Sequence, residues 1–308
     1  MFSLLTGFVP MAIDPLFFLP AGNFQLLPSA TFFTEFNNSI YFVAYIPNEG
    51  QVFDVDKEMK QVRAMTQMDQ LIEDIYKLFS GNQPGQYIDA CTDCCMSPVD
   101  ARRIKTIPLR EIPLELMIEY QGAAKPAVLD LAELKYFAPR ILEFIKDFQI
   151  PSFLPEVSLD RFSYFSDSDW TKEERQLLDA FALAFFGNYI AMPMQKDQLS
   201  LMEVLLMFYK GNFKINPLLQ LWAACDQPAS LLRFVQLLNS SEITRHGQFG
   251  IKNAFSEPIF ETQFRTWLEA ESTKAAFRQK IEQAIMEPSG EFTESELIEL
   301  SWQYDGLV

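Results

Sequence analysis

The sequence holds only one histidine, His246, among its 308 residues. Catalysis by an imidazole that activates a serine or cysteine would therefore depend on a single residue, and no glycine-rich nucleophile elbow lies beside it. The phosphate-binding patterns G-x-x-x-x-G-K-[ST] and G-x-G-x-x-G are also missing. These absences predict a protein that is not an enzyme, with no catalytic residue and no cofactor.

Basic residues are scarce. Lys and Arg total 25 against 41 Asp and Glu, so the net charge is −16. A field of this sign repels phosphate backbones, which disfavours nucleic-acid binding, and it attracts a partner with a basic surface. Solubility alone explains the charge equally well, so the charge restricts the class of partner without proving that one exists.

Early basic residues and long apolar runs are missing as well. The first basic residue is Lys57, so the chain lacks the basic region that precedes the apolar core of a secretory signal. Prolines interrupt the apolar N-terminal stretch before it reaches the roughly 18 residues of a membrane span. These are Pro10, Pro15, Pro20 and Pro28. We therefore expect a cytoplasmic protein that makes no membrane contact.

Cysteines are few, and three of the four lie close together. They are Cys91, Cys94, Cys95 and Cys225. A structural zinc site needs four ligands, and the remaining candidates, Cys225 and His246, are distant in sequence, so we predict no metal. Ser97 is expected to cap a helix that begins after the cysteines, whereas redox CxxC motifs begin a helix at the first cysteine. Buried structural thiols are the favoured interpretation, and metal binding and redox chemistry remain alternatives.

The pattern predicts a mainly α protein, either an irregular antiparallel helical bundle or a helical-repeat-like array, with a small N-terminal β element. The segment Ser39–Ile46 is β-branched and aromatic, which is typical of a strand. From Asp56 onward apolar residues recur at helical spacing, and short connections favour antiparallel neighbours. We expect four divisions. Residues 1–55 form a Phe/Pro-rich β-like segment packed on the helices, and residues 56–150 form a first helical block. Residues 151–170 form a connecting loop, and residues 171–308 form a second helical block.

Several helix boundaries carry recognisable signals. Capping boxes at Thr171–Glu174 and Thr293–Glu296 predict two helix starts. Pro139 predicts a kink or break in a helix over 130–148, and a second break is expected near Ser272. Arg140 is expected to support structure, by reaching carbonyls that the kink frees or an acid such as Glu111, rather than to take part in catalysis.

One stretch, residues 91–143, resembles a known pattern. It reads CxxCC-x-SP, then PLRE, then DLAELKYFxPRILE, at residues 91–98, 108–111 and 130–143. The pattern is similar to one that recurs among uncharacterised bacterial proteins. The resemblance implies a bacterial cytoplasmic protein and brings no activity with it.

Two stretches combine acids with aromatic residues, the two residue types that anchor and rim protein interfaces. The second of them, residues 286–308, has six acids and no base, with Trp302 and Tyr304 among them. Aromatic residues that pack inward beside solvated acids would explain either stretch without a partner. The other stretch, residues 162–174, is the favoured partner-binding surface, through Tyr164, Asp167, Asp169, Trp170, Glu173 and Glu174.

An acidic protein without catalytic motifs suits an immunity protein, which neutralises a cognate bacterial toxin or effector by occluding it. Many such toxins attack nucleic acids or nucleotides and are basic, so an acidic inhibitor complements them electrostatically. The immunity-like character is an analogy drawn from charge and from the absence of catalytic motifs. A non-catalytic intracellular adaptor or scaffold is the alternative, and an enzyme of unknown type comes third.

Overall fold

A computed structural model describes most of the chain, which divides into two compact units, 1–64 and 65–308. In the first unit, strands β1 (Thr31–Phe36) and β2 (Ser39–Ala44) form an antiparallel hairpin in which Thr31 faces Ala44. The rest of the expected Phe/Pro-rich segment lies outside the described residues. The described ranges are 31–36, 39–44, 66–195, 198–240, 242–244, 249–287 and 290–307.

The regular secondary structure of the second unit is almost entirely helical. Its α-helices are α2 (Gln67–Phe79), α3 (Pro98–Thr106), α4 (Leu114–Gly122), α5 (Leu131–Lys146), α6 (Lys172–Ala191), α7 (Leu201–Lys210), α8 (Ile215–Ala224), α9 (Pro228–Asn239), α10 (Pro258–Glu269), α11 (Glu271–Met286) and α12 (Glu294–Leu307). Short 3-10 helices are η1 (Leu109–Glu111), η2 (Pro155–Val157), η3 (Asp160–Tyr164) and η4 (Asp167–Asp169). Strands β3 (Ile243–Thr244) and β4 (Gly250–Ile251) pair as a second small hairpin. The prediction of a mainly α fold with a small N-terminal β element is confirmed.

Helix starts follow the capping chemistry of the sequence. Thr171 accepts a hydrogen bond from the amide of Glu174, whose carboxylate accepts one from the Thr171 amide in return. Thr293 and Glu296 make the same reciprocal pair before α12. Ser97 caps α3 through the amide of Asp100. Each pair satisfies amides that have no partner inside the helix, so these predicted starts are confirmed.

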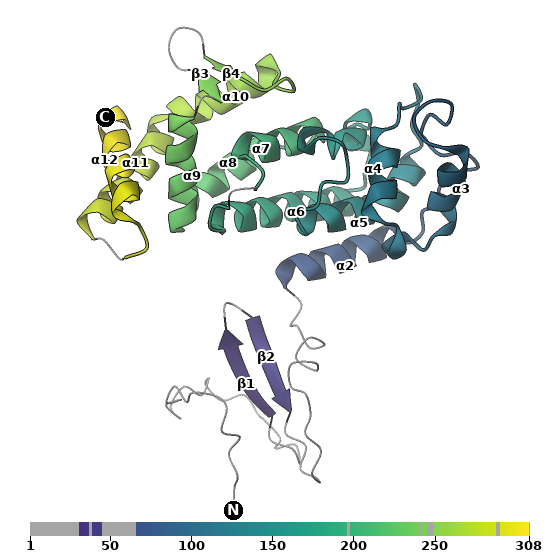
Figure 1. Cartoon of the computed structure of the whole chain (residues 1–308), viewed down its shortest axis with the longest axis horizontal. Coiled ribbons are helices and arrows are strands. Elements are labelled where there is room, and N and C mark those ends of the chain that lie inside the picture. The colour runs from purple at the N-terminus through teal and green to yellow at the C-terminus, as the bar shows by residue number, and fades with distance from the viewer. Residues whose placement is uncertain are drawn as a thin grey trace, which may run out of the picture. The chain divides into compact units, whose positions relative to one another are not determined.

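Helices α3 and α4 lie at one end of the unit and α12 lies at the other, with α6, α7, α8 and α9 between them (Figure 1). Helix α2 packs on α5 and α6, α6 packs on α8 and α9, and α11 packs on α12. Large apolar side chains that are fully buried, such as Phe137, Phe186, Phe208 and Trp222, fill the space between them. Within the part of the chain that the structure describes, no helix has the length and apolarity to cross a bilayer.

The sequence predicted helix interruptions at Pro139 and near Ser272, and the outcome differs between these two positions. Helix α5 continues through Pro139 to Lys146, so of the two outcomes predicted at this proline, a kink or a break, the break is wrong. Pro139 itself is buried within this helix. The interruption expected near Ser272 is present, because α10 ends at Glu269 and α11 starts at Glu271.

The stretch 151–170 is more than the connecting loop expected from its prolines. It contains η2, η3 and η4, and it buries Leu159, Arg161 and Phe162 in the common core. Arg161 donates hydrogen bonds to the backbone carbonyls of Asp89 and Tyr120. The stretch therefore joins the two predicted helical blocks into the single compact unit 65–308.

Candidate functional site

The predicted partner-binding stretch keeps four of its six residues at the surface. Tyr164 is 53% exposed, and Asp167, Asp169 and Glu173 are exposed as well. Hydrogen bonds from Ser166 hold the pKa of Asp169 below its ordinary value, so that this carboxylate is charged at neutral pH. We call these four residues the 164–173 face.

The other two predicted contacts, Trp170 and Glu174, are not available to a partner. Trp170 is 7% exposed and stacks on Phe162 at a centroid distance of 5.8 Å. Glu174 is also 7% exposed, and its carboxylate accepts a hydrogen bond of 2.8 Å from Lys135. Both residues are buried in the folded unit, so the structure does not expose them for the contact predicted from the sequence.

Helix α12 presents a second acidic and apolar surface. Trp302 is 70% exposed and Ile298 is 45% exposed, and their spacing of four residues puts them on the same side of the helix. Glu294 and Glu299 are exposed beside them. On the opposite side, Leu300 is fully buried against the core. We call Glu294, Ile298, Glu299 and Trp302 the α12 face.

The C-terminal segment that contains the α12 face carries charged residues of one sign. The last basic residue of the sequence is Lys280, so the whole of residues 281–308 is without Lys or Arg. Lys280 itself donates hydrogen bonds to the carbonyls of Ala223 and Cys225, away from this segment. An exposed indole with an acidic border matches the anchor-and-rim composition of protein interfaces.

The clustered cysteines are surface thiols, which corrects the expectation that they are buried. Cys94 and Cys95 are exposed and Cys91 is half-buried. The Sγ atoms of Cys91 and Cys94 are 3.5 Å apart, and those of Cys94 and Cys95 are 3.3 Å apart. The buried side chain of this loop is Met96 instead, at 2% exposure.

The three thiols influence one another's ionisation. The backbone amides of Cys94 and Asp93 donate hydrogen bonds to the Cys91 sulfur and lower the pKa of that thiol. Hydrogen bonding to the sulfurs of Cys95 and Cys91 stabilises the protonated Cys94 thiol, and together with repulsion between neighbouring thiolates it raises the pKa of Cys94 to about 12. The Cys91 thiol therefore loses its proton before the Cys94 thiol does.

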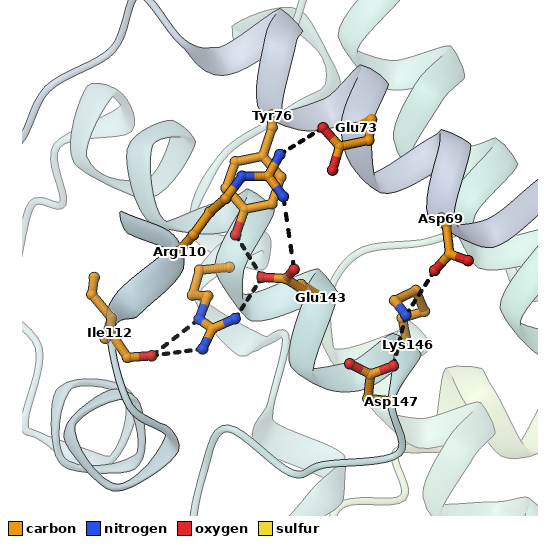
Figure 2. A network of polar contacts seen from close by, with 9 residues as sticks. Asp69, Glu73, Tyr76, Arg110, Ile112, Glu143, Lys146 and Asp147 are labelled. Atoms are coloured by element: carbon orange, nitrogen blue, oxygen red, sulfur yellow. Dashed lines mark hydrogen bonds and ion pairs between the residues drawn. The ribbon is translucent and has the colours of Figure 1, made fainter. Parts of the chain in front are cut away.

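A polar network joins α2, η1 and α5 (Figure 2). The Arg110 guanidinium lies 3.7 Å from the ring centroid of Tyr76 and donates a hydrogen bond of 2.7 Å to Glu73. The Tyr76 hydroxyl donates to Glu143 at 2.7 Å, and Arg110 lies 3.9 Å from the same carboxylate. Burial and this carboxylate raise the pKa of Tyr76 far above its ordinary value. The hydroxyl thus stays protonated and structural.

Arg140 lies in the same network, with the supporting role predicted from the sequence but with different partners. Its Nε and Nη2 atoms donate to the carbonyl of Ile112 at 3.0 and 2.9 Å. Its Nη1 atom donates to Glu143 at 2.6 Å, rather than to the expected Glu111. Arg140 therefore fixes the chain after η1 to helix α5.

A buried carboxyl that sequence reasoning missed lies near the cysteine loop. Glu133 is fully buried and accepts hydrogen bonds from the Asp89 amide at 2.7 Å and the Tyr120 hydroxyl at 2.8 Å, both at Oε1. Its Oε2 atom has no hydrogen-bond partner. Burial raises the pKa of Glu133 to about 7. Only the acidic start of the predicted helix, at Asp130 and Glu133, hinted at this group.

One cavity of about 370 Å³ lies between α8, α10 and α11. Its lining offers amide, hydroxyl and indole groups but no carboxylate, amine or thiol, from Gln220, Ala223, Ala224, Trp267, Ala270, Ser272 and Thr273. His246, the single histidine, lies outside the described residues. No protein-family model, curated protein or solved structure matches the chain.

Proposed function

We propose that this chain is a cytoplasmic inhibitor of the immunity type, which binds a cognate toxin or effector with a basic surface and occludes it. The observation that carries the proposal is the α12 face, where an exposed tryptophan and isoleucine lie in a segment without any basic residue. The net charge of −16 acts in the same direction over the whole molecule. The proposal includes no catalytic step.

The α12 face suits inhibition by binding for two physical reasons. Trp302 and Ile298 offer rigid apolar area that loses water when a partner covers it, and tryptophan is prominent among residues that dominate interface energetics. Glu294 and Glu299 give long-range attraction, which acts mainly on the rate of association. The 164–173 face offers Tyr164 and three acids, and it is the second surface to test.

The first experiment concerns the class of function. The gene next to that of this chain should encode a toxic protein with a basic surface, and co-expression of this chain should restore growth. We expect the two purified proteins to form a complex whose association slows steeply as salt is raised, with little change in dissociation. If co-expression gives no protection and the proteins do not bind, the inhibitor proposal fails and the adaptor becomes the better proposal.

A second experiment locates the surface. The double variant Glu294→Lys/Glu299→Lys should weaken binding more than tenfold, a loss of over about 1.4 kcal/mol, because it replaces attraction by repulsion beside the apolar anchor. Trp302→Ala should cost at least as much. The control is Asp167→Lys/Glu173→Lys, which changes the net charge by the same amount on the 164–173 face.

Comparing the two double variants distinguishes the effect of charge on the α12 face from the effect of the net charge of the whole protein. Equal losses would mean that only net charge matters, and a larger loss for the control would place the contact on the 164–173 face. Either result would remove the α12 face from the proposal and leave the inhibitory function to be judged by the growth assay.

A further inference from the structure

Three sulfur atoms converge at the surface of the unit, in the loop that leads into α3. The Sγ atoms of Cys91, Cys94 and Cys95 all lie within 4.8 Å of one another. Thiolate sulfurs bound to one metal ion at about 2.3 Å would lie about 3.8–4.0 Å apart in tetrahedral or trigonal geometry. The 3.5 and 3.3 Å separations along the loop are shorter than that spacing by about 0.3 to 0.7 Å, so the sulfurs need to move apart only slightly to hold one ion.

The backbone holds this arrangement from both sides. The Cys91 amide donates to the carbonyl of Ala124 at 2.8 Å, which ties the loop to the end of α4. The Met96 amide donates to the Cys91 carbonyl at 3.0 Å and closes the loop on itself. Met96 packs into the core and Ser97 caps α3, so the exit of the loop is fixed too. The sulfurs are therefore brought together before any ion arrives.

We propose that Cys91, Cys94 and Cys95 bind one soft, thiophilic metal ion, Cu⁺ or Zn²⁺, through three thiolates in a site that is open on its solvent side. Two of the sulfurs are exposed, so an ion can enter without unfolding the loop. Thiolates select these ions over Mg²⁺ and Ca²⁺, which prefer oxygen ligands.

The absence of a fourth protein ligand was the sequence-based reason to expect no metal, and it applies only to closed structural zinc sites. Among the described residues the group has three members, all of them sulfur. Three protein ligands with one open position are the arrangement of exchangeable zinc sites, and soft three-sulfur sets also suit Cu⁺. Zn²⁺ would take a fourth ligand from solvent, whereas Cu⁺ would need none.

The test is a metal titration of the full-length protein, reduced with a phosphine and kept free of oxygen. Zn²⁺ and Cu⁺ are titrated separately against a chelator of known affinity, and bound metal is counted by elemental analysis. We expect about one equivalent of at least one of the ions, bound by three sulfurs in its X-ray absorption spectrum. An additional oxygen or nitrogen neighbour would identify the zinc form, and its absence the copper form.

Cys94→Ser should weaken binding by at least about 100-fold, because one of three ligands is lost. Cys225→Ser is the matched control, since it removes a thiol outside the group, and its affinity should equal that of the unsubstituted protein. Binding far below one equivalent for both ions would overturn the proposal, as would equal affinities for the two variants. So would a Cys91–Cys94 disulfide whose reduction does not give metal binding, since the pair would then be a redox pair.

Discussion

Replacing Trp170 by alanine should lower the free energy of unfolding by about 3–5 kcal/mol, the range for an aromatic side chain removed from a packed core. Trp170 stacks on Phe162 and makes edge contacts with Phe79 and Phe165, and the Lys135 ammonium lies 5.3 Å from its ring. These neighbours come from α2, α5 and the 151–170 stretch. The alanine variant therefore leaves a cavity where three parts of the unit meet, and denaturant unfolding measures its cost.

Trp302→Ala is the matched control for this prediction, since it removes the same side chain from a site that is 70% exposed. Its free energy of unfolding should stay within about 0.5 kcal/mol of that of the unsubstituted protein. If both variants lost little stability, Trp170 would not be a core residue. The contrast also separates folding from binding, because Trp302 is the residue whose loss should weaken a complex.

The stability of the protein should depend on pH through Glu133. Its pKa is raised from the ordinary value of 4.5 to about 7, so the folded state holds a proton that the unfolded state releases between these values. The contribution of Glu133 to stability is then greatest at low pH and falls as pH rises from 4.5 to 7, with a total loss on the order of 3 kcal/mol. Glu133→Gln, which stays neutral, should escape this loss.

The measurement is the difference in free energy of unfolding between Glu133→Gln and the unsubstituted protein. Between about pH 5.5 and pH 8 this difference should move by about 2 kcal/mol in favour of the variant. Glu119→Gln, which changes an exposed glutamate on α4, should show no such movement. A difference that is constant over this range would contradict the assignment of a raised pKa to Glu133.

Short-range chemistry made many of the helix boundaries predictable. The capping boxes at Thr171 and Thr293 and the cap at Ser97 depend on side chains three residues apart, which a sequence displays directly. Helix α7 was missed although Ser200 and Glu203 form the same kind of box. The run that follows is apolar at nearly every position and is buried almost throughout, so few polar residues mark an exposed side of this helix.

Long-range contacts set the limits of prediction. Arg161 and Trp170 lie in a stretch that looks like an exposed linker, but their partners Asp89, Tyr120 and Phe79 are distant in sequence. Nothing local to Trp170 reveals which of the aromatic residues around it turns inward. The prediction for the clustered cysteines was wrong in the opposite direction. Cysteine is usually buried, but this loop places Met96 in the core and leaves the thiols at the surface.

The carboxylate of Glu143 serves three partners at once, and this has a consequence for how the sequence can change. It accepts hydrogen bonds from Tyr76 and Arg140 and balances the charge of Arg110 (Figure 2). Loss of Glu143 alone would leave Arg140 without its carboxylate partner and the Tyr76 hydroxyl without its acceptor, although Arg110 would keep Glu73. Simultaneous replacement of the set by apolar residues avoids that cost. Across diverging relatives, we expect these positions to be inherited or exchanged as a block rather than one at a time.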